Sequence, residues 1–141
     1  MKRSVIVLIG IIYILAIVVV SFFGLKIETF NETKYVESVE ITNMDMECTI
    51  EDDNGKCIGE KYVVITYVDD PDNPTSYQLE WHVYPDDATR KIVSFAYDES
   101  KSFVTVNEFG AVIFSAKGSI TVYVNSTDGS AKTDAITIIA K

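Results

Sequence analysis

An uninterrupted apolar stretch near the N-terminus constrains this chain more than any other feature. No residue from 4 to 25 is charged, and as a helix this stretch would span about 33 Å, enough to cross a hydrocarbon core of about 30 Å. The alternative is a buried helix in a soluble domain, but the strand-patterned remainder of the chain could not easily surround a helix that is apolar on every face. The stretch is therefore predicted to cross a membrane once, in contact with lipid.

The flanking charges predict an orientation. Lys2 and Arg3 are the only charges before the stretch, and short basic flanks stay in the cytoplasm. Residues 1–3 are then a short cytoplasmic N-terminus, 4–25 a transmembrane signal anchor, 26–34 a spacer and 35–141 a domain outside the cell membrane. A cleaved secretory signal is the close alternative. The long apolar run and the bulky residues at its end favour an uncleaved anchor.

The exported part of the chain is acidic. Lys2 and Arg3 account for two of the 12 basic residues, which leaves 10 against 21 acidic residues and a formal charge of −11 beyond the stretch. Such a surface repels the phosphates of nucleic acids and anionic lipid headgroups. Nucleic acid is therefore excluded as a partner, and the simplest role of the charge is to keep the domain soluble.

Beyond the spacer, apolar and polar residues alternate with period two in short segments rich in β-branched and aromatic residues, as in half-buried strands. Clusters of Gly, Pro, Asn and Asp separate these segments, as turns require. The predicted strands cover residues 36–42, 46–50, 61–68, 76–84, 91–97, 103–106, 111–115, 119–125 and 133–139. The exported domain is therefore predicted to be all-β, a sandwich or a barrel.

The alternation also predicts which residues form the core. In the strand over 76–84, one face carries Tyr77, Leu79, Trp81 and Val83, and these should be buried because successive side chains point to opposite faces. The same rule gives an inward face to the later strands, formed by Val93, Phe95, Tyr97, Val104, Val106, Val112, Phe114, Ile120, Val122, Val124, Ile136 and Ile138.

An ordered series of motifs runs through the second half of the chain. It consists of Val83-Tyr84-Pro85-Asp86-Asp87-Ala88-Thr89, an aromatic core residue in 91–95, Val104-Thr105-Val106 with Gly110 opening the next strand, and Gly118, Asp128-Gly129 and a last strand over 135–138. In this order the chain resembles the group 2 bacterial immunoglobulin-like domains, which are often found in surface proteins and intimin-like adhesins. The resemblance covers residues 35–141 and is best from Tyr77 onward.

The resemblance implies an immunoglobulin-like β-sandwich with a structural or adhesive role, and it transfers no catalytic residue. Two features depart from the family. Phe95 stands where the family commonly has Trp, and residues 44–75 are longer than the usual link between the first two strands. The extra segment is where the individuality of this chain is expected.

The sequence offers no enzyme site and implies no cofactor or metal. The one histidine, His82, lies outside any nucleophile motif, and one histidine with two cysteines cannot complete an ordinary zinc site. In an exported domain, Cys48 and Cys57 on either side of a tight turn suggest a disulfide that closes a hairpin. Two reduced thiols are the alternative.

Two places are candidates for a ligand face. One is the strand face that carries His82 and Tyr84, and the other is the acidic loop with Asp69, Asp70 and Asp72. Asn73, Asp86 and Asp87 could add oxygens for Ca²⁺, but the spacing of an EF-hand loop is absent, so a solvated turn is predicted.

Three functions remain open. The first is a non-enzymatic, membrane-anchored extracellular module for cell-surface adhesion or envelope organisation. The second is a polysaccharide-binding module that uses one of the two candidate faces, and the third is a small scaffold subunit of a membrane protein complex. The partner, a protein or a glycan, is not identified by the residues.

Overall fold

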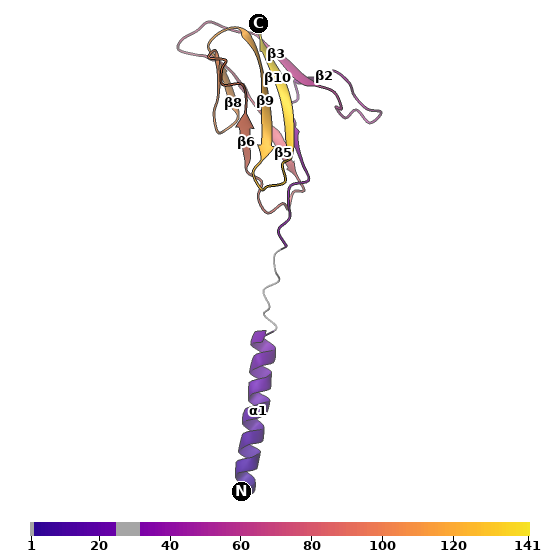
Figure 1. Ribbon diagram of the computed structural model, residues 1–141, viewed down its shortest axis with the longest axis vertical. Helices are drawn as coiled ribbons and strands as arrows, with labels where there is room; N and C mark the ends of the chain where they lie inside the picture. Colours follow the sequence, from indigo (N-terminus) through magenta and orange to yellow (C-terminus); the bar gives the residue numbers. More distant parts are fainter. Residues whose placement is uncertain (1, 25–31) are drawn as a thin grey trace. The chain divides into compact units, whose positions relative to one another are not determined.

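The computed structural model describes residues 2–24 and 32–141, which belong to two compact units, Met1–Thr33 and Lys34–Lys141 (Figure 1). The first unit contains one helix, α1 (Arg3–Gly24). Its segment Arg3–Phe22 is long and apolar enough to cross a membrane, although a signal sequence would pass the same test. The helix matches the predicted stretch closely, while most of the predicted spacer, residues 26–31, lies outside the described residues.

The second unit is built from ten strands, several of which are labelled in Figure 1. They are β1 (Ser38–Ile41), β2 (Glu47–Cys48), β3 (Lys61–Ile65), β4 (Thr75–Gln78), β5 (Trp81–Tyr84), β6 (Val93–Ala96), β7 (Val104–Val106), β8 (Ala111–Phe114), β9 (Gly118–Ser126) and β10 (Thr133–Ala140). Every predicted strand is present. The predicted strand over 76–84 is divided into β4 and β5, and the predicted strand over 46–50 is reduced to the two residues of β2.

The strands form two layers. One layer is a five-stranded sheet in the order β2-β3-β10-β9-β6, in which β3 runs parallel to β10. The other contains the pair β1-β5 and the sheet β4-β8-β7. Because β4 and β5 are consecutive halves of one strand, this layer has the order of the A, B, E and D strands of an immunoglobulin fold, and β6, β9 and β10 correspond to C, F and G. The predicted immunoglobulin-like β-sandwich is confirmed.

The core lies between the layers and uses the predicted faces. Buried side chains from both sheets include Leu79, Val83, Val112, Phe114, Ile120, Val122, Val124, Ile136 and Ile138. Trp81 and Phe95 pack against this core edge to face, with ring centroids 5.2 Å apart. Phe95 on β6 therefore contributes an aromatic ring at the edge of the core.

A glycine is required beside this aromatic pair. Gly110 has a φ of +78°, and a Cβ added there would lie 2.8 Å from Cζ3 of Trp81 and 3.0 Å from Cζ of Phe95. A side chain would be strained by the backbone angle and would also collide with the core. The turn before β8 thus depends on a glycine at this position.

Asn43 fills the break between β4 and β5. Its buried side-chain amide donates a hydrogen bond to the carbonyl of Gln78 at 2.8 Å, and its side-chain oxygen accepts one from the N–H of Glu80 at 2.8 Å. The N–H of Leu79 donates to the carbonyl of Gly110 at 2.9 Å. Buried backbone groups must find partners, so the strand can change its pairing here while Leu79 keeps its inward position.

Asp128 ties the start of the domain to the turn between β9 and β10. Its carboxylate accepts hydrogen bonds from Oγ of Ser130 at 2.6 Å, from the N–H of Val36 at 2.6 Å and from the N–H of Ser130 at 3.0 Å. These bonds, with that from Oγ of Ser130 the strongest, lower the pKa of Asp128 to about 2. The ionised form of Asp128 is therefore more stable in the folded protein than in the unfolded chain.

The lowered pKa of Asp128 predicts an acid-dependent loss of stability. A carboxylate with a depressed folded pKa stabilises above its unfolded pKa, near 3.8, and this contribution disappears as the pH falls through about 2. Asp128→Asn should lower the urea midpoint at pH 6 and make it less dependent on pH between 4 and 2. Ser130→Ala, which removes one donor, should have an intermediate effect. An Asp128→Asn variant with the wild-type pH profile would contradict this assignment.

Candidate binding surfaces

The first predicted face carries His82 and Tyr84 on the outer side of β5. Both side chains are exposed, and their ring centroids lie 4.4 Å apart. Nε2 of His82 lies 2.5 Å from Oδ1 of Asp86, four residues further along the chain. The imidazole is therefore paired with a carboxylate at the surface, and its ring lies next to that of Tyr84 at an interplanar angle of 54°.

The second predicted face is the acidic loop between β3 and β4. A pocket of about 240 Å³ is lined there by Tyr67, Asp69, Asp70, two prolines and Phe114. The Tyr67 hydroxyl donates to the carbonyl of Ser115 at 2.8 Å, and burial together with the charge of Asp69 raises its pKa. Oδ1 of Asp70 accepts from the N–H of Asp72 at 3.0 Å, so this carboxylate is used within its own loop.

The structure does not bring the two predicted faces together. The acidic loop precedes Thr75, the first residue of β4, whereas Tyr84 is the last residue of β5. The two halves form one extended run of the chain, so at about 3.3 Å per residue these ends are roughly 30 Å apart. They are two separate surfaces. Within residues 2–24 and 32–141, no three His, Cys, Asp or Glu side chains are placed to hold a metal ion.

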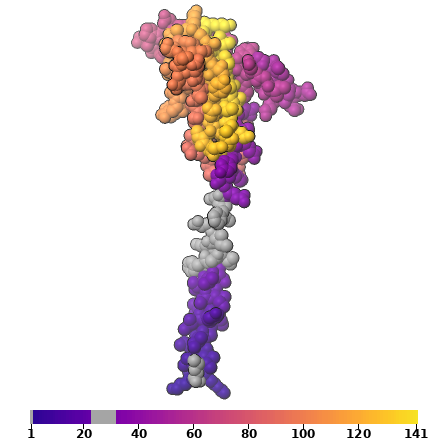
Figure 2. All heavy atoms as spheres, viewed as in Figure 1, coloured from indigo at the N-terminus to yellow at the C-terminus, as the bar shows by residue number. Residues whose placement is uncertain are grey.

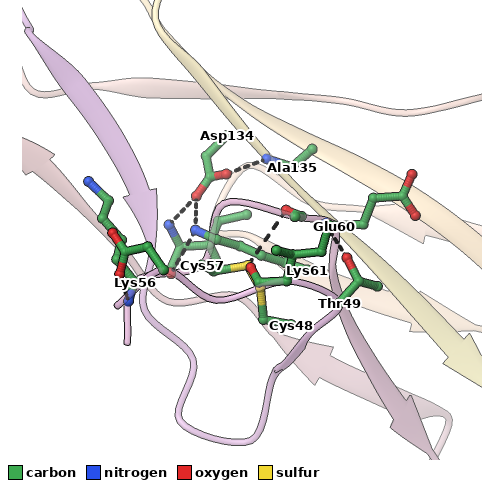
Figure 3. The surroundings of a disulfide bond; sticks show 12 residues. Cys48, Thr49, Lys56, Cys57, Glu60, Lys61, Asp134 and Ala135 are labelled. Carbon is green, nitrogen blue, oxygen red and sulfur yellow. Dashed lines mark hydrogen bonds and ion pairs between the residues drawn. A yellow bond between two sulfur atoms is a disulfide. The ribbon is translucent and has the colours of Figure 1, made fainter. Parts of the chain in front are cut away.

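A third surface is formed by residues 47–60, which we call the arm. It is a bent hairpin between β1 and β3, and its strands are joined where the N–H of Thr49 donates to the carbonyl of Glu60 at 3.0 Å. Cys48 and Cys57 are linked by a disulfide, with their Cα atoms 5.7 Å apart (Figure 3). At the tip, Oδ1 of Asp52 accepts from the N–H groups of Asn54 and Lys56, which fixes the turn.

A cleft of about 270 Å³ separates the arm from the sandwich. It is lined by residues 38–40 of β1, by residues 56–59 of the arm, and by Lys61 and Asp134. The Lys61 ammonium forms an ion pair with Oδ2 of Asp134, and the same carboxylate oxygen accepts from the N–H of Ile41 at 2.7 Å (Figure 3). This cluster links β1 of one layer to β3 and β10 of the other.

Sequence reasoning did not identify the Lys61–Asp134 pair. The two residues are 73 positions apart, and nothing in their local sequence distinguishes them from other charges on predicted strands. The sequence contains one signal for the two positions, because Lys61 and Asp134 each lie near the start of a strand that the alternation pattern predicts. Only the parallel pairing of β3 with β10 brings them together.

Comparison with known proteins finds distant structural likenesses. Solved structures of an EHEC O157:H7 intimin mutant and of the intimin–Tir90 complex share 19% and 20% sequence identity with this chain, both with a TM-score of 0.44. Each match covers 75% of this chain and 48% of the intimin chain, so the chain spans about half the length of those it matches. No family model and no curated protein matches this chain.

Proposed function

We propose that this chain is a non-enzymatic surface module: a group 2 immunoglobulin-like domain held outside the cytoplasm by one uncleaved transmembrane helix, which attaches or organises components of the cell envelope. The observation that carries the proposal is the combination in one chain of an apolar helix long enough to cross a membrane and an acidic β-sandwich whose cysteines are joined. Disulfides persist in oxidising compartments outside the cytoplasm.

The charges around the helix support the orientation. Lys2 precedes α1, Arg3 is its first residue, and the first turn of α1 contains no acidic residue. Basic residues flanking a membrane helix stay on the cytoplasmic side, which directs the C-terminal unit outward. The large negative charge of that unit also opposes its adsorption to anionic headgroups.

The surfaces of the sandwich support a binding role rather than catalysis. The single histidine is paired with Asp86 at an exposed position, far from both cysteines in the sequence, and these are joined to each other. The exposed features of the sandwich include the His82–Tyr84 pair on β5 and the disulfide-linked arm. Such features provide contact area for a partner.

Protease treatment of intact cells tests the export of the domain. A full-length chain with a C-terminal tag should be recovered in the membrane fraction at its full mass of 15.7 kDa plus the tag. Adding protease to intact cells should remove the tag, because the tag lies outside the membrane. A cytosolic marker protein should survive the same treatment.

The same experiment separates the alternatives. A shortened, soluble product outside the membrane would show that the N-terminal helix is a cleaved signal. A tag that resists protease until the cells are lysed would show that the domain is cytoplasmic and would overturn the proposal.

A further inference from the structure

The arm is an addition to the immunoglobulin framework. The arm joins the framework only through β2, a two-residue edge strand that pairs with β3, and residues 49–60 extend beyond the five-stranded sheet. None of the residues from 47 to 60 is buried. Figure 2 shows the arm as a projection from the side of the domain. A segment with no buried residue contributes little to the folding core, so its defined shape needs another explanation.

The arm exposes two isoleucines, one on each side of its hairpin. The N–H groups of Ile58 and Gly59 both donate to the carbonyl of Ile50 at 3.0 Å, a bulge in which two residues oppose one. Ile50 is 59% exposed and Ile58 is 66% exposed. A Cβ at Gly59 would lie 2.7 Å from the N atom of Ile50, so the glycine permits the close approach of the two backbone segments at the bulge.

The arm that carries the two isoleucines is also acidic. The arm contains five acidic residues, Glu47, Glu51, Asp52, Asp53 and Glu60, and one basic residue, Lys56. Glu47 and Asp52 accept hydrogen bonds from Tyr62 and from the turn. In the part of the chain that the structure describes, the side chains of Glu51, Asp53 and Glu60 form no hydrogen bond or ion pair, and their charges are available to a partner.

From these observations we propose that the arm is a docking surface for a second protein, whose binding site is an apolar pocket with a basic rim. An apolar centre within a polar rim is the usual arrangement of a protein interface. The disulfide and the turn at Asp52 hold the arm in one shape, which reduces the entropy lost on binding. The acidic side chains of the arm select a basic partner and speed its encounter.

Charge also decides between this partner and other occupants. A second copy of the chain would bring two acidic domains together, and like charges facing each other oppose association. Anionic lipid headgroups and nucleic acids are repelled for the same reason. The inference rests on the proposed export of the domain, because the partner must meet the arm on the same side of the membrane.

Site-specific photo-crosslinking tests the docking surface. A photoreactive amino acid replaces Ile50 in the full-length chain in its own cells, and a matched probe replaces Ile92, which is 63% exposed on the sandwich itself. The Ile50 probe should form one adduct with a protein whose exposed domain is basic, and the Ile92 probe should not. Ile58→Ser should lower the yield roughly tenfold.

Two further variants test the charge and the shape. Glu51→Lys, and separately about 1 M salt on isolated membranes, should each lower the yield several-fold, whereas Glu99→Lys, a charge reversal outside the arm, should not. Replacing both cysteines by serine should lower the yield while leaving the unfolding temperature of the sandwich within a few degrees. A yield that is unchanged in the cysteine variant would show that the fixed shape is not used.

An adduct with a second copy, with lipid or with glycan would overturn the inference, as would the absence of any adduct in cells where protease shaving shows an exported domain. Shaving reports on the proposed function without depending on the arm. A failure of export is therefore distinguished from a failure of docking.

Discussion

Replacing Phe114 by alanine should destabilise the sandwich by about 3 to 5 kcal/mol, the range for truncating a fully buried aromatic side chain. Phe114 on β8 is 1% exposed, and its ring stacks on that of Phe103 with centroids 6.5 Å apart. Truncation would leave a cavity between the two sheets that the surrounding strands cannot close. For a domain of this size, a loss of 3 kcal/mol lowers the unfolding temperature by more than about 10 °C.

Tyr123→Ala is the matched control for this variant. Tyr123 is also an aromatic residue on a central strand, but it lies on the outer face of β9 and is 46% exposed. Its removal should change the free energy of unfolding by about 0.5 kcal/mol or less. The single tryptophan, Trp81, packs against the core, so its fluorescence in the full chain in detergent reports unfolding of both variants. Equal losses would mean that the two faces of the sheets are wrongly assigned.

The alternation of side chains explains why the core could be predicted from the sequence. A strand has a strict period of two, so the apolar residues of β8, β9 and β10 identify the inner face without knowledge of the partners. Val112, Val122 and Ile136 are buried as predicted. The prediction depended only on local order along the chain, and local order is what a single sequence contains.

Pairing between distant strands was not available from the sequence. The alternation continues through Leu79 and Glu80, so nothing marks the point where one strand divides into β4 and β5. The break depends on Asn43, which is 35 and 37 residues away from its two backbone partners. In the same way, β3 was predicted as a strand, but its parallel pairing with β10 follows from the closed topology of the sandwich.

For the candidate surfaces, too, the sequence predicted local features and not their position in the fold. The spacing of Cys48 and Cys57 indicated a hairpin, and the structure places a disulfide-linked arm there. The exposure of Ile50 could not be predicted, because an isoleucine at the end of a predicted strand is usually a core residue. Its position on an arm outside the framework reverses that expectation, and the arm exists because the link between β1 and the framework strand β3 is long.

Replacing Lys61 by methionine should destabilise the domain by about 3 kcal/mol. The ammonium of Lys61, whose side chain is 9% exposed, pairs with a carboxylate of Asp134 that is 20% exposed. Removing one partner of such a pair leaves a poorly solvated charge, which costs about 3 to 5 kcal/mol in a dry interior. The partial exposure of Asp134 places this case at the lower end. Urea unfolding at pH 7 measures the loss.

Asp134→Asn in the Lys61→Met background distinguishes charge from packing. The asparagine oxygen can still accept the hydrogen bond that Asp134 takes from the N–H of Ile41 at 2.7 Å, and it brings no charge into the space between β1 and β3. The double variant should therefore recover most of the stability lost by Lys61→Met, because replacing both members of a buried pair is often nearly neutral. Without this recovery, the loss would belong to the packing of the lysine methylenes, and the ion pair would not be what joins the two layers at this edge.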